Sequence, residues 1–135
     1  MTATTIQRER LAELHAQLVA SGVYTVEQLQ GLRHDPDLAI TRAWLARKVR
    51  SHQLFVVAEN DGILVPAFQL TDTLHSRPEL ISVLEVLSNA GLRGWGIWAW
   101  LATWSGWLDG IPAEVVAADS ELVLVAARRF VSNAS

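Results

Sequence analysis

The sequence has no cysteine among its 135 residues, and this absence removes several classes of protein at once. Disulfides, thiolate metal sites and cysteine nucleophiles are all excluded. A small secreted domain stabilised by disulfides is therefore excluded as well. Charge is also sparse, since only 19% of the residues are charged while half are hydrophobic, so a disordered chain is not expected. Four prolines and eight glycines leave room for long regular elements.

No arrangement typical of catalysis or metal binding is present. None of the four histidines, His15, His34, His52 and His75, is spaced as a metal ligand with another histidine or an acid. The acidic residues are scattered singly rather than paired for general acid–base catalysis. The glycines near residue 94 lack the preceding strand and the lysine of a phosphate-binding loop. We therefore expect no enzyme activity, cofactor or metal ion.

The charge that the chain does carry is unevenly distributed. Residues 1–58 hold seven basic and five acidic side chains, whereas residues 59–135 hold four basic and nine acidic ones. Four cations, Arg42, Arg47, Lys48 and Arg50, lie within nine residues that contain no acid. This asymmetry predicts two lobes with different partners. The first residues lack the apolar core of a signal peptide, so a cytoplasmic location is expected.

Tryptophan is concentrated in one stretch, residues 91–116, which holds five of the six in the chain. An indole buries about 200 Å² when it is fully enclosed, so this stretch must form a core, a membrane element or a docking surface. The uncharged run Gly94–Leu108 is 15 residues long, short of the roughly 20 that span a bilayer. It also lacks the neighbouring basic face of an interfacial helix, and no membrane contact is expected.

On a helix over about 94–104, one side would hold Trp95, Trp98, Ala99 and Ala102. The other side would hold Ile97, Trp100, Leu101 and Trp104. One side is expected to close the core of its own lobe and the other to meet a partner chain, because tryptophan is common in interface hot spots. The candidate residues for a partner or dimer interface are Trp95, Trp98, Trp100, Trp104, Trp107 and Leu108.

The N-terminal part predicts three helices, over residues 5–21, 25 to about 33, and 35 or 36 to about 49. Thr25 and Gln28 have the spacing of a capping box. Three short helices, the last of them basic, are typical of a helix-turn-helix unit, in which one helix crosses the phosphates and the next enters the major groove. The DNA-binding candidates are Arg42, Arg47, Lys48 and Arg50, although a solvated basic face would have the same pattern.

The period then changes to that of a β-hairpin, with strands at residues 54–58 and 63–70 around an Asn-Asp-Gly turn. This hairpin resembles the wing of a winged helix, or could simply join the two lobes. Helices are predicted over 78–89, 94–104, 112–118 and 120–131. The residues expected to be buried along the helices are Leu11, Leu14, Leu18, Val19, Val26, Leu29, Leu32, Leu80, Ile81, Leu84, Leu87, Leu122, Val123, Ala126, Ala127 and Phe130. The apolar positions of the third helix, which ends near residue 49, are Leu38, Ala39, Ala43, Leu45, Ala46 and Val49.

The predicted fold is therefore mainly α. It comprises a helix-turn-helix-like lobe over residues 1–52, a β-hairpin connector over 53–70 and a C-terminal helical lobe over 71–135. No internal repeat interrupts this division.

Three segments in order resemble the toxin-binding domain of the Xre/MbcA/ParS-type antitoxins. They are Pro66-Ala-Phe-Gln-Leu, Trp98-Ala-Trp-Leu-Ala-Thr and Leu108-Asp-Gly-Ile-Pro-Ala-Glu-Val-Val. The resemblance covers about residues 54–130, and the Leu-Asp-Gly-Ile-Pro turn is its most specific part. Members of that family are largely helical, tend to dimerise and usually carry an N-terminal helix-turn-helix lobe.

The resemblance implies an antitoxin that neutralises a RES-domain toxin, an enzyme resembling ADP-ribosyltransferases that depletes NAD. It further implies that the complex blocks the toxin's active site and represses its own operon. The alternative is a stand-alone dimeric DNA-binding regulator without a toxin partner. A small enzyme is the third and least favoured class.

Overall fold

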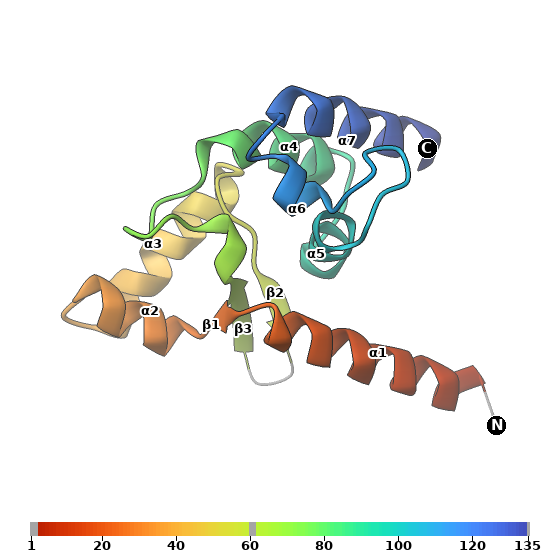
Figure 1. The fold of residues 1–135 in the computed structure, drawn as a ribbon. Coiled ribbons are helices and arrows are strands. Elements are labelled where there is room, and N and C mark those ends of the chain that lie inside the picture. Colours follow the sequence, from red (N-terminus) through yellow and green to blue (C-terminus); the bar gives the residue numbers. More distant parts are fainter. Residues whose placement is uncertain (1–2, 60–61, 135) are drawn as a thin grey trace.

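The computed structural model describes residues 3–59 and 62–134, and it confirms the mainly α fold. Its helices and strands are arranged in two groups, with α1–α3 and the sheet on one side and α4–α7 on the other (Figure 1). The α-helices are α1 (Ala3–Ala20), α2 (Val26–Arg33), α3 (Leu38–Arg50), α4 (Pro78–Asn89), α5 (Gly94–Ala102), α6 (Pro112–Val115) and α7 (Ser120–Ala134). The strands are β1 (Val23–Tyr24), β2 (Val57–Glu59) and β3 (Gly62–Pro66), and the 3₁₀-helix η1 covers Ala67–Gln69.

Local side chains fix where several helices begin. The predicted capping box of α2 is present, since Thr25 accepts from the Gln28 amide while the Gln28 side chain accepts from the Thr25 amide. Helix α3 is capped by Asp37, whose carboxylate accepts from the Ile40 amide at 3.1 Å, and not by Asp35 or Pro36 as predicted. Asp35 instead binds the Arg33 guanidinium at 2.8 Å and the Thr41 hydroxyl at 2.7 Å.

The three strands form an antiparallel sheet in the order β1-β3-β2. The hairpin β2–β3 lies where it was predicted, although β2 is shorter and β3 ends at Pro66, before η1. The two central residues of its predicted turn, 60 and 61, lie outside the described residues. Strand β1 was not predicted, because two residues carry no detectable periodicity. It adds a third strand by pairing Val23 with Pro66 and Tyr24 with Val65.

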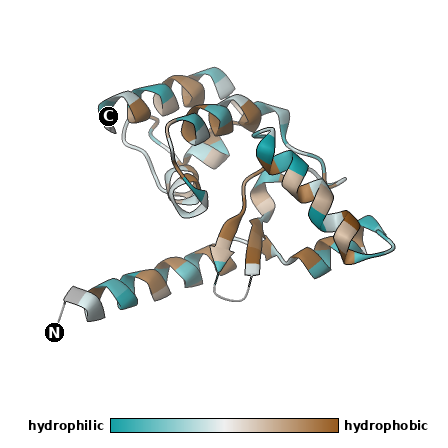
Figure 2. Ribbon diagram, turned by 180° about the vertical axis from the view of Figure 1, so that it is seen from behind, coloured by the Kyte–Doolittle hydropathy of each residue, from teal (hydrophilic) through white to brown (hydrophobic). Residues whose placement is uncertain are grey.

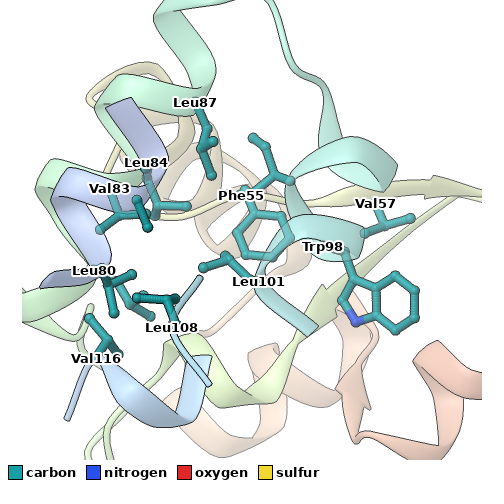
Figure 3. Packing of buried hydrophobic residues seen from close by; sticks show 14 of the residues in the cluster. Phe55, Val57, Leu80, Val83, Leu84, Leu87, Trp98, Leu101, Leu108 and Val116 are labelled. Atoms are coloured by element: carbon teal, nitrogen blue, oxygen red, sulfur yellow. The ribbon is translucent and has the colours of Figure 1, made fainter. Parts of the chain in front are cut away.

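Two hydrophobic clusters hold the fold together, and the segment leading into β2 contributes to both. The smaller cluster joins α2, α3 and the sheet through Val26, Leu29, Leu45, Leu54 and Val65. The larger cluster joins α4, α5 and α7, which pack around Phe55 and Val57. Figure 3 shows Leu101 of α5 lying among Phe55, Leu84 and Leu108. Because Leu54 enters one cluster and Phe55 the other, this segment links the two groups of helices.

Gln69 is a buried polar side chain that completes the backbone hydrogen bonding between these groups. Its Oε1 accepts from the Phe55 amide at 2.8 Å, and its Nε2 donates to the Phe55 carbonyl at 2.7 Å. The side chain is 1% exposed. The amide therefore pairs with Phe55 as a neighbouring strand would, which satisfies two backbone groups that burial would otherwise leave unpaired.

Helix α1 differs from its predicted packing. Leu18 is buried and Leu14 is half-buried, but Leu11 and Val19 are 59% and 47% exposed, contrary to prediction. Only the last turns of α1 meet the rest of the molecule, and its N-terminal part extends away from it (Figure 2). The apolar side of the helix therefore continues past the core. Leu32 of α2, also predicted to be buried, is 51% exposed.

The C-terminal helices largely follow their predicted patterns. In α4 the buried residues are Leu80, Val83, Leu84 and Leu87, so Val83 takes the core position that was predicted for Ile81. In α7 the core face is Val123, Ala126 and Ala127, whereas Leu122 and Phe130 are more than a third exposed, contrary to prediction. The small Ala126 and Ala127 face the core, which accords with close packing of α7 against α4.

Candidate DNA-binding and partner-binding surfaces

The exposed side of α3 combines arginine with alanine. Arg42, Arg47 and Arg50 are exposed, and they share this side of the helix with three small residues, Ala39, Ala43 and Ala46. These alanines were predicted among the apolar positions of the helix, but they are exposed, and only the larger apolar side chains turn inward. Leu45 and Thr41 on the opposite side are buried against the sheet and α2. The predicted basic helix therefore presents three of its four cations outward together.

Lys48, the fourth predicted cation, is placed differently. Its Nζ donates to Gln53 Oε1 at 2.8 Å, and the side chain is half-buried at the C-terminal end of α3. Its position in the helical repeat puts it well away from Arg42, Arg47 and Arg50. The helical repeat was therefore enough to separate Lys48 from the other three, whereas its hydrogen bond to Gln53, beyond the helix end, was not predictable from that repeat.

A groove of about 760 Å³ runs between α3 and the hairpin. Its helix wall includes Arg42, Ala46, Val49 and Arg50, and its hairpin wall includes Ile63 and Leu64. Residues Thr25 to Glu27, at the start of α2, also line it. We call this feature the α3–hairpin groove. Sequence reasoning missed it, because the groove depends on how far the hairpin stands from α3.

The tryptophans follow the predicted division in part, since Trp98 is buried with Trp95 packed against it while Trp104 is exposed. The buried face of α5 is Ile97, Trp98 and Leu101, so Ile97 and Leu101, predicted on the side of Trp100 and Trp104, face the core instead. Because every side of α5 is apolar, the sequence pattern could not show which side faces the core. Trp95 is half-buried, packs edge-on against Trp98 at 5.9 Å between ring centroids, and donates its indole N–H to the Ala58 carbonyl at 3.2 Å.

The loop after α5 carries the two exposed indoles. Trp104 and Trp107 are 59% and 49% exposed, and the Arg129 guanidinium lies 5.0 Å from the centroid of Trp107. Trp100 is half-buried beside Phe130, with 6.1 Å between their ring centroids. These five residues, Trp100, Trp104, Trp107, Arg129 and Phe130, form what we call the aromatic surface.

The turn over residues 105–110, which carries Trp107 and directly follows Trp104, is held in place at several points. Ser105 and Gly110 exchange backbone hydrogen bonds of 2.8 and 3.3 Å across it. Leu108 is 8% exposed and lies in the larger cluster, so it is a core residue rather than part of a partner surface. A Cβ on Gly110 would lie 2.7 Å from Val115 Cγ2, and Asp109 adopts a positive φ of 52°. The turn thus requires Gly110, and it presents the indoles on a constrained backbone.

Within the described part of the chain, no group of three or more histidines and acids is placed to hold a metal ion. Across the same residues, no helix combines the length and the apolarity needed to cross a bilayer.

Comparisons with known proteins give a structural likeness alone. No family model matches the chain, and no curated protein matches it significantly. The NMR structure of Rv2175c is similar in fold, with a TM-score of 0.67 over 82% of each chain. The two sequences are 19% identical, so the likeness extends to the fold and no further.

Proposed function

We propose that the chain is a DNA-binding protein that inserts α3 into the major groove. The observation that carries this proposal is the exposed face of α3, on which Arg42, Arg47 and Arg50 stand among alanines. Alanine side chains let a helix backbone approach base pairs closely and make apolar contact with the thymine methyl group. Arginines on such a face reach phosphates or the guanine edge.

The surrounding topology supports this proposal. Helices α2 and α3 follow each other with a short connection, and the antiparallel hairpin β2–β3 comes directly after α3. With β1 pairing on the other side of β3, this is the element order of a winged helix. In helix-turn-helix proteins the second helix lies in the major groove while the first crosses the backbone.

DNA binding is tested with a labelled duplex from the region upstream of the gene, by fluorescence anisotropy over a series of salt concentrations. The logarithm of the affinity should fall linearly with the logarithm of salt, by about 0.9 for each phosphate neutralised. We expect each of the variants Arg42→Ala, Arg47→Ala and Arg50→Ala to reduce the slope of log affinity against log salt by about 1, if the replaced arginine contacts a phosphate. Lys48→Ala is the matched control, because Lys48 lies on the same helix but binds Gln53.

Two results would overturn the proposal. One is no binding by the wild-type protein even at about 50 mM salt, where phosphate contacts are strongest. The other is an equal loss of affinity in Lys48→Ala and in the three arginine variants, which would show that the exposed face is not the contact surface.

The aromatic surface supports a second function, binding of a protein partner. We propose that this partner is a RES-type toxin, which the chain neutralises as the antitoxins it resembles do. The supporting observation is that Trp104 and Trp107 are exposed on a constrained loop. Exposed tryptophans on a rigid support are typical of interface hot spots. The same surface could also join two copies of the chain.

Co-expression with the product of the adjacent gene, followed by size-exclusion chromatography, tests this second function. The complex should co-elute, and replacing Trp104 and Trp107 with alanine should weaken it by about 30-fold or more, as loss of a hot spot does. Leu32→Ala is the control, since Leu32 is equally exposed but lies on α2. Light scattering of the chain alone separates a homodimer from a monomer. If replacing both indoles left the affinity of the complex unchanged, the aromatic surface would be rejected as the partner-binding site.

A further inference from the structure

The α3–hairpin groove has walls that are largely apolar. Val49 on α3 and Val56, Ile63 and Leu64 on the hairpin side are half-buried and line it, and the buried Leu45 lies at its base. Its volume of about 760 Å³ falls within the range of roughly 300–1,000 Å³ that is usual for small-molecule sites. Apolar walls of this kind favour an apolar ligand, at about 25 cal/mol for each Å² removed from water.

The helix wall of the groove carries two cations that can pair with an anion. Arg42 and Arg50 both line the helix wall, two turns apart on one side of α3. Neither has a carboxylate within salt-bridge distance among residues 3–59 and 62–134. Of the two acids that line the groove, Glu59 is bound to His15 at 2.7 Å and Glu27 is exposed at its α2 end. Two guanidinium groups thus remain available beside the apolar walls.

We propose that the α3–hairpin groove is a binding site for a small amphipathic carboxylic acid. The apolar body of the ligand covers Val49, Val56 and Ile63, and its carboxylate pairs with Arg42 or Arg50. Arginine suits this role because its planar guanidinium binds a carboxylate in bidentate fashion. A neutral molecule of the same shape would make the apolar contacts alone and bind more weakly.

The site adds a regulatory consequence that depends on the proposed DNA binding. Arg42 and Arg50 belong both to the groove and to the exposed face of α3, so a carboxylate bound there withdraws from DNA the arginine with which it pairs. Ligand and DNA would then compete, and each would lower the apparent affinity for the other. The binding site itself does not depend on this consequence.

The test uses 2-naphthoate as the acid and 2-naphthalenemethanol as its neutral counterpart, each titrated into the full-length ¹⁵N-labelled chain without DNA. Naphthoate should shift amide signals of α3 and the hairpin, and should bind about tenfold more tightly than the alcohol, as expected for one charge-assisted pair. The variant Arg42→Ala/Arg50→Ala should remove this preference. Arg47→Ala should retain it, because Arg47 is on the same helix but does not line the groove.

Filling the groove gives a second and independent readout. Ala46→Trp should abolish binding of both probes, because Ala46 lines the helix wall and is exposed, so the indole would occupy the groove. Equal affinity for the acid and the alcohol, or signal shifts confined to the aromatic surface, would overturn the proposal even if Ala46→Trp does not fold. Displacement of DNA by naphthoate is measured in a separate experiment. The titrations without DNA therefore show whether the ligand site exists even if the protein binds no DNA.

Discussion

Replacing Gly94 by alanine should separate α5 from the hairpin. Gly94 is the first residue of α5, and a Cβ placed on it would lie 2.0 Å from the Val56 carbonyl oxygen and 3.0 Å from Val57 Cα. Both neighbours are backbone atoms in the segment that links the two clusters, so neither can move aside as a flexible side chain would. The variant must therefore displace α5 or β2 by about 1 Å or more to reach ordinary contact.

The expected cost follows from this displacement. Overpacking of a tight contact commonly destabilises a protein by about 1–3 kcal/mol. At the size of this chain, each kcal/mol lowers Tm by about 3–5 °C, so a fall of roughly 3–15 °C is expected. Helix propensity offsets little of this cost, because Gly94 is in the first turn. Since Trp95 donates to Ala58 next to the same contact, its fluorescence should change along with stability.

Gly96→Ala is the matched control, two residues further along the same helix. A Cβ there would meet only Leu92 side-chain atoms, at 3.6–3.8 Å, which is ordinary contact. That variant should be neutral or more stable by up to about 1 kcal/mol, the usual gain of alanine over glycine in a helix. Thermal and urea unfolding followed by circular dichroism give both values. If Gly94→Ala were as stable as Gly96→Ala, the close approach of α5 to Val56 would be refuted.

Three further substitutions test the core and one ion pair. Leu101→Ala should lower stability in urea unfolding by about 2–5 kcal/mol, since Leu101 is fully buried in the larger cluster, and a smaller loss would mean a looser core. Gln69→Leu should cost about 2–5 kcal/mol in the same assay, because it leaves the N–H and C=O of Phe55 buried without partners; an unchanged midpoint would contradict this role. The hydrogen bonds from Arg33 and Thr41 lower the pKa of Asp35, so their stabilisation is present at neutral pH and lost as the pH falls through that lowered pKa. Asp35→Asn should thus lower Tm at pH 7 and flatten its decline in acid below about pH 4, and an unaltered acid profile would count against the pair.

Helix positions could be predicted well where a local rule decides them. Pro78 and Gly91 bracket α4, and the Thr25–Gln28 capping box starts α2, as expected from sequence alone. These signals involve neighbours in the chain, so no tertiary information is needed. The hairpin was found for the same reason, because its two apolar, β-branched runs and the Asn-Asp-Gly turn between them are adjacent in sequence.

Tertiary placement is what the sequence could not provide. Leu11 has helical spacing with Leu18, yet it is exposed because α1 meets the body of the protein only in its last turns. Val19 lies next to the buried Leu18 but faces away from the core. In α5 every face is apolar, so periodicity could not identify Ile97 and Trp98 as neighbours in the core. The hydrogen bond of Lys48 to Gln53 depends on how the chain turns after α3, and the α3–hairpin groove depends on the position of the whole hairpin.

The segments that carry the family resemblance have clear structural roles in this chain. Gln69 of the Pro-Ala-Phe-Gln segment completes the hydrogen bonds of Phe55. In the Leu-Asp-Gly-Ile-Pro turn, Leu108 is buried in the core and Gly110 lies close against Val115. A chain could therefore keep both segments to preserve its fold while changing its partner. The resemblance thus bears more directly on how the C-terminal lobe folds than on what it binds.

Partner choice should instead reside in residues that the core does not need. Trp104 and Trp107 satisfy this condition, since both are exposed while Leu108 anchors their loop. Replacing both indoles with alanine should leave the free energy of unfolding within about 0.5 kcal/mol of wild type, as surface substitutions usually do, while weakening partner binding by about 30-fold or more. A large loss of stability in this variant would show that the indoles serve the fold, and would remove the physical basis for assigning them to a partner.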